Sequence, residues 1–261
     1  MKDIKCFVLD MDGTIYLGDE LFSYTKDFLK KAEALGLDIW FYTNNSSKNP
    51  EFYIEKLKKM GIDWPLEKML ISNQVIIKYL LDNHKDSKVY LSGTSYLHED
   101  FKKAGINLSD KDCDVVVMGF DTSLTYEKLV IASDFVRYGA KFYGVNMDYN
   151  CPTETGFIPD CGSICKLIEA STGVAAEFFG KPSSHTANYI LDRTGYSKDQ
   201  IAIVGDRLYT DIALGVNNGI KSFLVMSGEA KEEDLKTSEF KPDYIFKNLE
   251  ELGKALEDLE R

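Results

Sequence analysis

The sequence predicts an α/β protein built around a mainly parallel β-sheet. Short β-rich apolar runs alternate with longer segments of helical periodicity, and the helical segments repeatedly stop at a glycine. Such alternation is typical of βαβ units. Glycine often follows a helix end because it adopts the left-handed conformation at no steric cost. At 261 residues, the chain is long enough for one large domain or two modest ones.

The predicted strands are short runs rich in apolar and β-branched residues. In chain order they are Cys6–Leu9, Ile39–Tyr42, Val89–Leu91, Val115–Met118, Phe142–Val145, Ile201–Val204, Ser222–Val225 and Tyr244–Phe246. The predicted helices between them end at Gly36, Gly61, Gly105, Gly139, Gly173, Gly195 and Gly219. Residues at helical spacing mark the buried face of the first helix, namely Phe28, Leu29, Ala32 and Leu35. Several such helices should cover both faces of the sheet.

Composition excludes several classes of protein. The chain has 31 Lys plus Arg, 42 Asp plus Glu, a net charge of −11 and 44% hydrophobic residues, as in ordinary globular proteins. An acidic surface repels polyanions, so we expect no nucleic-acid polymer as partner. The longest apolar runs, such as Val115–Met118, are far shorter than the roughly 20 residues that span a bilayer, so no membrane association is expected.

The N-terminus and the cysteines indicate a reducing compartment. The first residues lack the apolar stretch and the cleavage site of a signal peptide, and we therefore expect a cytoplasmic protein. The five cysteines show no C-x-x-C spacing and are expected to be free thiols.

Polar residues follow four of the apolar runs. Ligands of open parallel sheets bind beyond the carboxyl ends of the strands, so these positions are the first candidates for a site. They are Asp10, Thr43-Asn44-Asn45, Gly180-Lys181-Pro182 and Asp206.

The first of these positions opens the motif Asp10-Met11-Asp12-Gly13-Thr14. Two carboxylates on one side of an extended stretch invite a divalent cation. A calcium-binding EF-hand loop is excluded, because it needs Gly where Ile15 stands and Glu where Leu21 stands. A simple strand-end turn, in which Asp and Gly serve the backbone, is the alternative for these residues taken alone.

The second acidic motif comprises Asp206 and, five positions on, Asp211, where a new helix should begin. An acid at a helix N-terminus is a sufficient structural reason for Asp211 but accounts poorly for Asp206. The two acidic motifs can share one magnesium ion only if their strands lie near each other. Carboxylates crowded in this way would be costly without a cation.

Thr43, Asn44 and Lys181 have the chemistry of a phosphate site. A hydroxyl and an amide at a turn toward a helix, with an ammonium nearby, can hold phosphate oxygens. Each also has an ordinary alternative, since turns use Thr and Asn and most lysines are solvated.

Together these residues predict phosphoryl transfer. Asp10 would attack phosphorus and form an aspartyl-phosphate. Magnesium, Lys181 and Thr43 would offset the repulsion between the two anions. Asp12 would donate a proton to the leaving oxygen and later remove one from water.

With these motifs in place, the sequence resembles the haloacid dehalogenase superfamily of phosphohydrolases. The resemblance implies a Rossmann-like core in which Asp10 is the nucleophile and Asp12 the general acid and base. It also implies substrate binding by Thr43, Asn44, Asn45 and Lys181, and Mg²⁺ binding by Asp10, the Asp12 carbonyl and Asp206. Supporting roles fall to Gly13, Thr14 and Asp211, the last of which would orient Lys181 or a metal-bound water.

The segment between Thr43 and Lys181 has strand and helix signals of its own, and its position resembles the inserted α/β cap of the NagD-like or para-nitrophenylphosphatase branch. The expected division is a discontinuous core of residues 1–78 and 179–261 and a cap of residues 79–178. Asn146, Asp148 and the loop through Glu154 are candidates for substrate contact, with ordinary loop hydrogen bonding as the alternative. Asp160 departs from the small residue that many members carry there.

The expected function is a magnesium-dependent phosphatase that hydrolyses a small phosphomonoester through an aspartyl-phosphate. Two alternatives stay open: a non-catalytic phosphometabolite-binding protein, and a phosphotransferase or mutase on the same core. The expected partner is a small phosphorylated metabolite, and exposed apolar cap surface would favour a homodimer. Which metabolite it is lies beyond the sequence.

Overall fold

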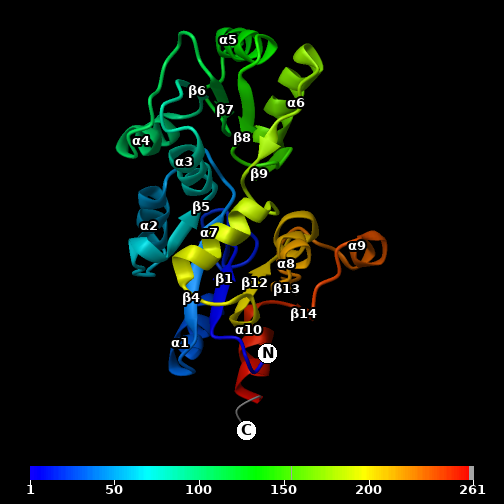
Figure 1. Ribbon diagram of the computed structural model, residues 1–261. Coiled ribbons are helices and arrows are strands. Elements are labelled where there is room, and N and C mark those ends of the chain that lie inside the picture. Colours follow the sequence, from blue (N-terminus) through cyan, green and yellow to red (C-terminus); the bar gives the residue numbers. More distant parts are fainter. Residues whose placement is uncertain (154, 259–261) are drawn as a thin grey trace. The chain divides into compact units, whose positions relative to one another are not determined.

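The computed structural model describes residues 1–153 and 155–258, so Glu154 lies outside the described residues. The chain forms two compact units, drawn in Figure 1. Unit 1 comprises Met1–Thr43, Ile54–Leu70 and Lys181–Arg261, and unit 2 comprises Asn44–Tyr53 and Ile71–Gly180. The chain therefore passes between the units directly after Thr43 and directly before Lys181.

Unit 1 is built on a parallel sheet with the strand order β14-β13-β12-β1-β4-β5. The strands are β1 (Cys6–Leu9), β4 (Asp38–Thr43), β5 (Met69–Ile71), β12 (Ile201–Gly205), β13 (Lys221–Val225) and β14 (Tyr244–Phe246). Strand β1 pairs with β12 on one side and with β4 on the other, and all of its residues are buried. Complete burial is expected of a central strand in a parallel sheet covered on both faces.

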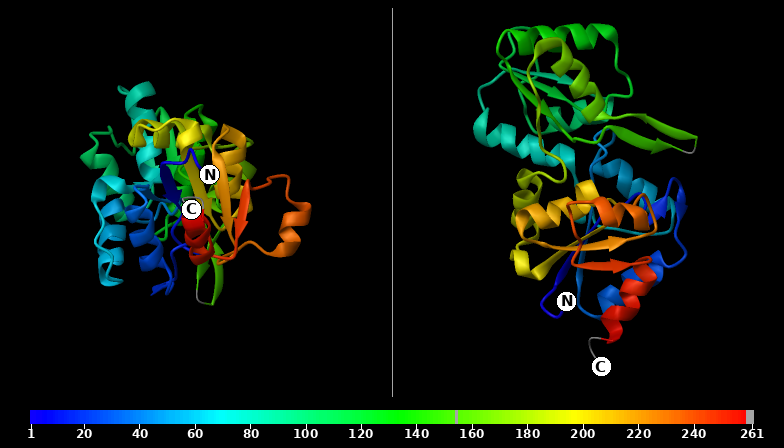
Figure 2. Two further views of the ribbon diagram at one scale, coloured as in Figure 1. Left: turned by 90° about the horizontal axis from the view of Figure 1, so that it is seen from below. Right: turned by 90° about the vertical axis from the view of Figure 1, so that its right-hand side faces the viewer.

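Helices pack against the sheet of unit 1. Helices α1 (Thr25–Ala34) and α10 (Leu249–Asp258) pack side by side, as Figures 1 and 2 show, and α7 (Ser184–Thr194) packs against α8 (Ala213–Asn218). Other helical elements of this unit are α9 (Glu232–Thr237), the short turns η1 (Leu66–Lys68), η2 (Lys198–Gln200) and η3 (Leu208–Ile212), and the part of α2 (Pro50–Lys59) from Ile54 onward. All seven predicted end glycines have positive φ, from 67° to 100°, which confirms the helix ends.

Unit 2 is a second α/β module. Its parallel sheet has the order β11-β8-β7-β6, from β6 (Val89–Ser92), β7 (Val115–Met118), β8 (Lys141–Gly144) and β11 (Glu177–Phe178). Its helices are α3 (Ser72–Asn83), α4 (Ser95–Lys103), α5 (Tyr126–Arg137) and α6 (Cys161–Thr172). A hairpin of β9 (Asn150–Thr153) and β10 (Gly156–Pro159) extends from this module (Figure 2).

The α/β prediction is confirmed, with local differences. The predicted strands lack β11 and the pair β2 (Tyr16–Leu17) and β3 (Glu20–Leu21), because two residues carry no periodic signal, and they lack β5, whose three residues run directly into α3. They also lack the β9–β10 hairpin, whose residues are mostly exposed and do not alternate. The helix expected to begin at Asp211 begins at Ala213 instead, after a π-helical turn, η3 (Leu208–Ile212).

No helix in the described part of the chain is long and apolar enough to cross a bilayer. All five cysteines are free thiols in the described part of the chain.

Candidate active site

Three of the predicted site residues stand at the ends of three adjacent strands in unit 1. Asp10 follows β1, Asp206 follows β12, and Thr43 is the last residue of β4. The backbone N–H of Asp10 donates to the carbonyl of Val204 over 2.8 Å and continues the ladder between β1 and β12 by one step. The strands that precede the two acidic motifs are therefore direct neighbours, as they must be if the motifs are to share one magnesium ion.

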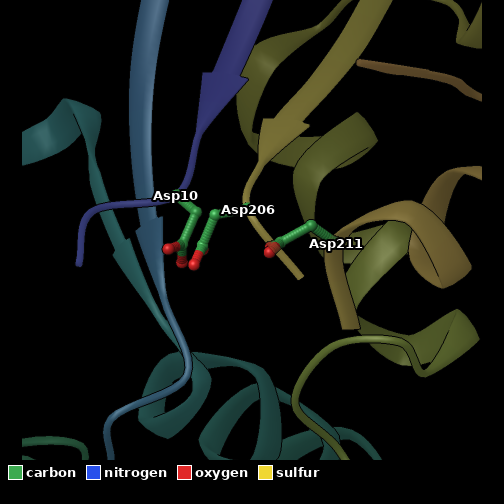
Figure 3. Close-up of side chains that lie close together, drawn as sticks. All are labelled: Asp10, Asp206 and Asp211. Carbon is green, nitrogen blue, oxygen red and sulfur yellow. The ribbon is translucent and has the colours of Figure 1, made fainter. Parts of the chain in front are cut away.

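The carboxylates of Asp10, Asp206 and Asp211 form one cluster. One oxygen from each lies within 4.8 Å of the others. Figure 3 shows the carboxylates of Asp10 and Asp206 side by side, with that of Asp211 directed toward them from η3. Asp206 and Asp211 are only 2% and 1% exposed, so water screens their charges poorly.

Lys181 provides the ammonium group of this cluster. Its Nζ donates hydrogen bonds to Asp10 Oδ1 and Asp211 Oδ1, each over 2.6 Å, and the side chain is 3% exposed. The lysine that follows an apolar run of the sequence therefore joins the same site as the two acidic motifs. Asp211 holds Lys181, which is one of the two roles that the resemblance implied.

Burial determines the electrostatics of the cluster. It raises the pKa of Asp10 to about 7, although the Lys181 ammonium works in the opposite direction. Burial also raises the pKa of Asp206 well above its usual range, and the charges of Asp10 and Asp211 raise it further. For Lys181, burial lowers the pKa but the two bonded carboxylates raise it by more, so the ammonium stays charged.

Backbone from two glycines surrounds the Asp206 carboxylate. A β-carbon on Gly13 or on Gly228 would overlap Asp206 Oδ2, and Gly13 also has a φ of 83° that favours glycine. The N–H of Glu229 donates to Asp206 Oδ2 over 2.7 Å, and Ser227 Oγ donates to the Gly13 carbonyl over 2.8 Å. The loop that holds Gly228 and Glu229 was not predicted from the sequence. It directly follows the predicted strand Ser222–Val225, so the rule that ligands bind beyond strand ends could have found it.

The cluster fits a divalent cation. Asp206 Oδ1 is buried and has no hydrogen-bond partner among the described residues, so one carboxylate oxygen is available as a ligand. Among the described residues, three carboxylates cluster around the Lys181 ammonium, and although the Arg207 charge also acts on Asp10 and Asp206, the carboxylates outnumber these two cations. Carboxylate oxygens are the ligands that Mg²⁺ prefers. Asp10 and Asp206 are the side chains that would hold it, since they lie side by side, whereas both oxygens of Asp211 are already bonded, to Lys181 and to the Arg207 N–H.

Asp12 lies two residues beyond Asp10 and is half-buried. Burial raises its pKa, whereas the charges of Lys56 and Arg207 lower it. Lys56 is fixed beside this segment, because its Nζ lies 4.1 Å from the centroid of the Tyr16 ring. A half-buried carboxyl with a raised pKa suits proton transfer near neutral pH. Thr14 is fully buried close by in the same motif.

The other predicted substrate contacts belong to unit 2, where they form a buried network. Asn44 Nδ2 donates to Asp148 Oδ2 over 2.8 Å, and Asn146 Nδ2 donates to Asp148 Oδ2 and to Asp160 Oδ1, each over 3.0 Å. Asp160 also caps α6 through the Cys161 N–H. Asn45 Oδ1 accepts from the backbone and hydroxyl of Ser47. These side chains thus have structural tasks, and their contact with substrate stays a prediction.

Replacing Asp148 with alanine should destabilise unit 2. The variant removes the acceptor shared by Asn44 and Asn146, and a buried amide left without its partner costs about 1–3 kcal/mol. Urea unfolding measures the change in the free energy of unfolding. Asp110→Ala is the matched control, because Asp110 is an exposed acid of the same unit. Equal stability of the two variants would contradict a stabilising role of the network.

Comparison with known proteins identifies the family of the chain. Profiles described as "Haloacid dehalogenase-like hydrolase" and "HAD-hyrolase-like" match residues 7–107 and 178–252. The chain is 37% identical to the acid sugar phosphatase of Staphylococcus aureus (strain MRSA252) over 262 aligned positions, which cover all of both proteins.

Solved structures agree with this relationship. A 4-nitrophenylphosphatase from Thermotoga maritima matches with a TM-score of 0.94 and 41% identity, covering 97% of this chain and 98% of the other. NagD from E. coli K-12 matches with a TM-score of 0.88 and 28% identity, covering 95% and 98%. These matches confirm the resemblance inferred from the motifs. The chain therefore belongs to the haloacid dehalogenase-like hydrolases, in the branch that includes NagD and the p-nitrophenylphosphatases.

Proposed function

We propose that this protein is a magnesium-dependent phosphatase that hydrolyses a small phosphomonoester through an aspartyl-phosphate on Asp10. The observation that carries the proposal is the placement of Asp10 beside both Asp206 and the Lys181 ammonium, at the ends of neighbouring parallel strands. A nucleophilic carboxylate needs positive charge close by, because its own charge repels the phosphate that it attacks.

Each residue of the site in unit 1 has its own role in the reaction. Asp10 attacks phosphorus with one carboxylate oxygen while the bond to the leaving oxygen breaks, and Asp12 gives that oxygen a proton. Asp12 then takes a proton from water as the water attacks the phosphorus of the aspartyl-phosphate, which restores the Asp10 carboxylate and releases inorganic phosphate. Lys181 and Thr43 bind the remaining phosphoryl oxygens, and Asp211 holds Lys181 in place.

Magnesium, when bound by Asp10, the Asp12 carbonyl and Asp206, supplies positive charge that offsets the repulsion between the nucleophile and the phosphate. The excess of buried carboxylate charge and the available Asp206 Oδ1 support this assignment.

For the substrate, we propose a sugar phosphate, a nucleoside monophosphate or a similar small metabolite. The names of the relatives support this class, since they include an acid sugar phosphatase and a 4-nitrophenylphosphatase. We further propose that residues 79–178 act as a cap that selects the leaving group, and that Asn146 and Asp148 take part in this selection. We also propose that the protein is located in the cytoplasm.

Release of inorganic phosphate from a panel of small phosphomonoesters, with magnesium chloride and with a chelator, tests this function. Turnover that requires magnesium supports the proposal, and the ranking within the panel identifies the preferred leaving group. Tight binding of several panel members without any turnover would instead favour a phosphometabolite-binding protein.

Gly228→Ala should lower magnesium-dependent turnover by about 100-fold, because displacing a reacting group by about 1 Å can have that effect. The added methyl group would overlap the Asp206 carboxylate and push it out of place. Gly253→Ala in α10 is the control, since its β-carbon would meet only the flexible side chain of Lys31 and the Phe28 ring, at 3.3 Å and 3.4 Å. Turnover of Gly228→Ala equal to that of the control would show that Asp206 tolerates displacement.

A further inference from the structure

The aromatic ring of Tyr42 is a further partner of the Lys181 ammonium, beside Asp10 and Asp211. Lys181 Nζ lies over this ring, 5.2 Å from its centroid. Both side chains are buried, with 1% and 3% of their surface exposed. A cation within about 6 Å of an aromatic centroid is attracted by the negative face of the ring, and the attraction is strongest where water is excluded.

The ring itself is held firmly. Tyr42 is part of β4 and directly precedes Thr43, so the strand fixes its backbone. Its hydroxyl makes a 3.0 Å hydrogen bond with Thr186 Oγ1, and Thr186 is fully buried in α7. Helix α7 begins three residues after Lys181. The ring is thus fixed at its edge by the same helix that follows the lysine.

During turnover, Asp10 would change chemically, whereas the other two contacts of Lys181 would not. Under the proposed function, the Asp10 carboxylate becomes an acyl phosphate, so Lys181 exchanges its bond to Asp10 for bonds to the phosphoryl oxygens during the reaction. Asp211 and the Tyr42 ring are chemically unchanged throughout. A flexible lysine that exchanges one charged partner for another needs fixed contacts to keep its ammonium in place.

We infer that Tyr42 is a positioning residue for Lys181, and that its ring face holds the ammonium in place while Asp10 is phosphorylated. This inference rests on the proposed role of Lys181 as a phosphate ligand. The ring face, and not the hydroxyl group, would position the Lys181 ammonium. No signal in the sequence distinguishes Tyr42 from the other apolar residues of its strand.

Fluorination of the ring tests the inference, because it removes the negative electrostatic potential of the ring face while it largely preserves the shape of the side chain. Tyr42→Phe should retain kcat/KM for p-nitrophenyl phosphate within about twofold, since the ring face remains. Tyr42→trifluorophenylalanine should lower kcat/KM about tenfold relative to Tyr42→Phe, and should weaken inhibition by inorganic phosphate. The melting temperatures of the two variants should agree, which separates positioning from stability.

Phe41→trifluorophenylalanine is the matched control. Phe41 is the preceding residue of β4, fully buried against Trp64, and its fluorination should leave kcat/KM unchanged. Equal kcat/KM for the two Tyr42 variants, or an equal loss at Phe41, would overturn the inference. Lys181→Met separates this failure from a failure of the proposed function, because full activity of that variant would overturn the role of Lys181 itself.

Discussion

Asp10→Asn should lower turnover of phosphomonoesters by about 10⁴-fold or more, the size of loss found when a covalent nucleophile is removed. The amide preserves the shape of the side chain but cannot form the acyl phosphate. It also removes one of the carboxylates that would hold magnesium. Initial rates of phosphate release at saturating substrate and magnesium measure the effect.

Asp63→Asn is the control for this prediction, because Asp63 is an exposed acid of unit 1 and the variant removes the same charge. Its turnover should match that of the wild type. Acid-quenched enzyme from a reaction at steady state should carry a phosphoryl group on the peptide that contains Asp10. Undiminished turnover in Asp10→Asn would exclude Asp10 as the nucleophile and with it the proposed reaction.

Several short strands of the fold were predicted well from the sequence. Strands Val115–Met118 and Tyr244–Phe246 appear with the predicted bounds, because each is a short apolar run between polar or turn-forming neighbours. The order of the strands could not be read in this way. That β12 lies beside β1, although almost two hundred residues separate them, follows from packing of the whole unit and not from any local pattern.

The candidate site was predictable to the extent that it follows the strand-end rule. Asp10 and Asp206 come directly after apolar runs, so the sequence indicated that they meet where the strands of one sheet end. The Gly228 loop and the Tyr42 ring were not found, since the first acts through backbone and the second has the composition of a core residue. For Asn146 and Asp148, the structure adds a buried network that the sequence could not reveal, and their contact with substrate stays a prediction.

The charge balance of the cluster leads to a second large effect, on stability. Lys181→Met should reduce the free energy of unfolding by about 3–5 kcal/mol in the absence of divalent metal, because it leaves Asp10 and Asp211 buried without their cation. Magnesium chloride should recover part of this loss, since it brings positive charge to the same carboxylates. Urea unfolding with and without magnesium measures both effects.

An ion pair of equal length but different burial provides the control for this argument. Lys221 and Asp243 are also 2.6 Å apart, yet the Lys221 side chain is 54% exposed, compared with 3% for Lys181. Lys221→Met should therefore cost less than about 1 kcal/mol, with or without magnesium. If the two lysine variants lost equal stability, burial of the cluster would not be what makes Lys181 indispensable. A large loss confined to Lys181→Met and relieved by magnesium would identify uncompensated carboxylate charge as its cause.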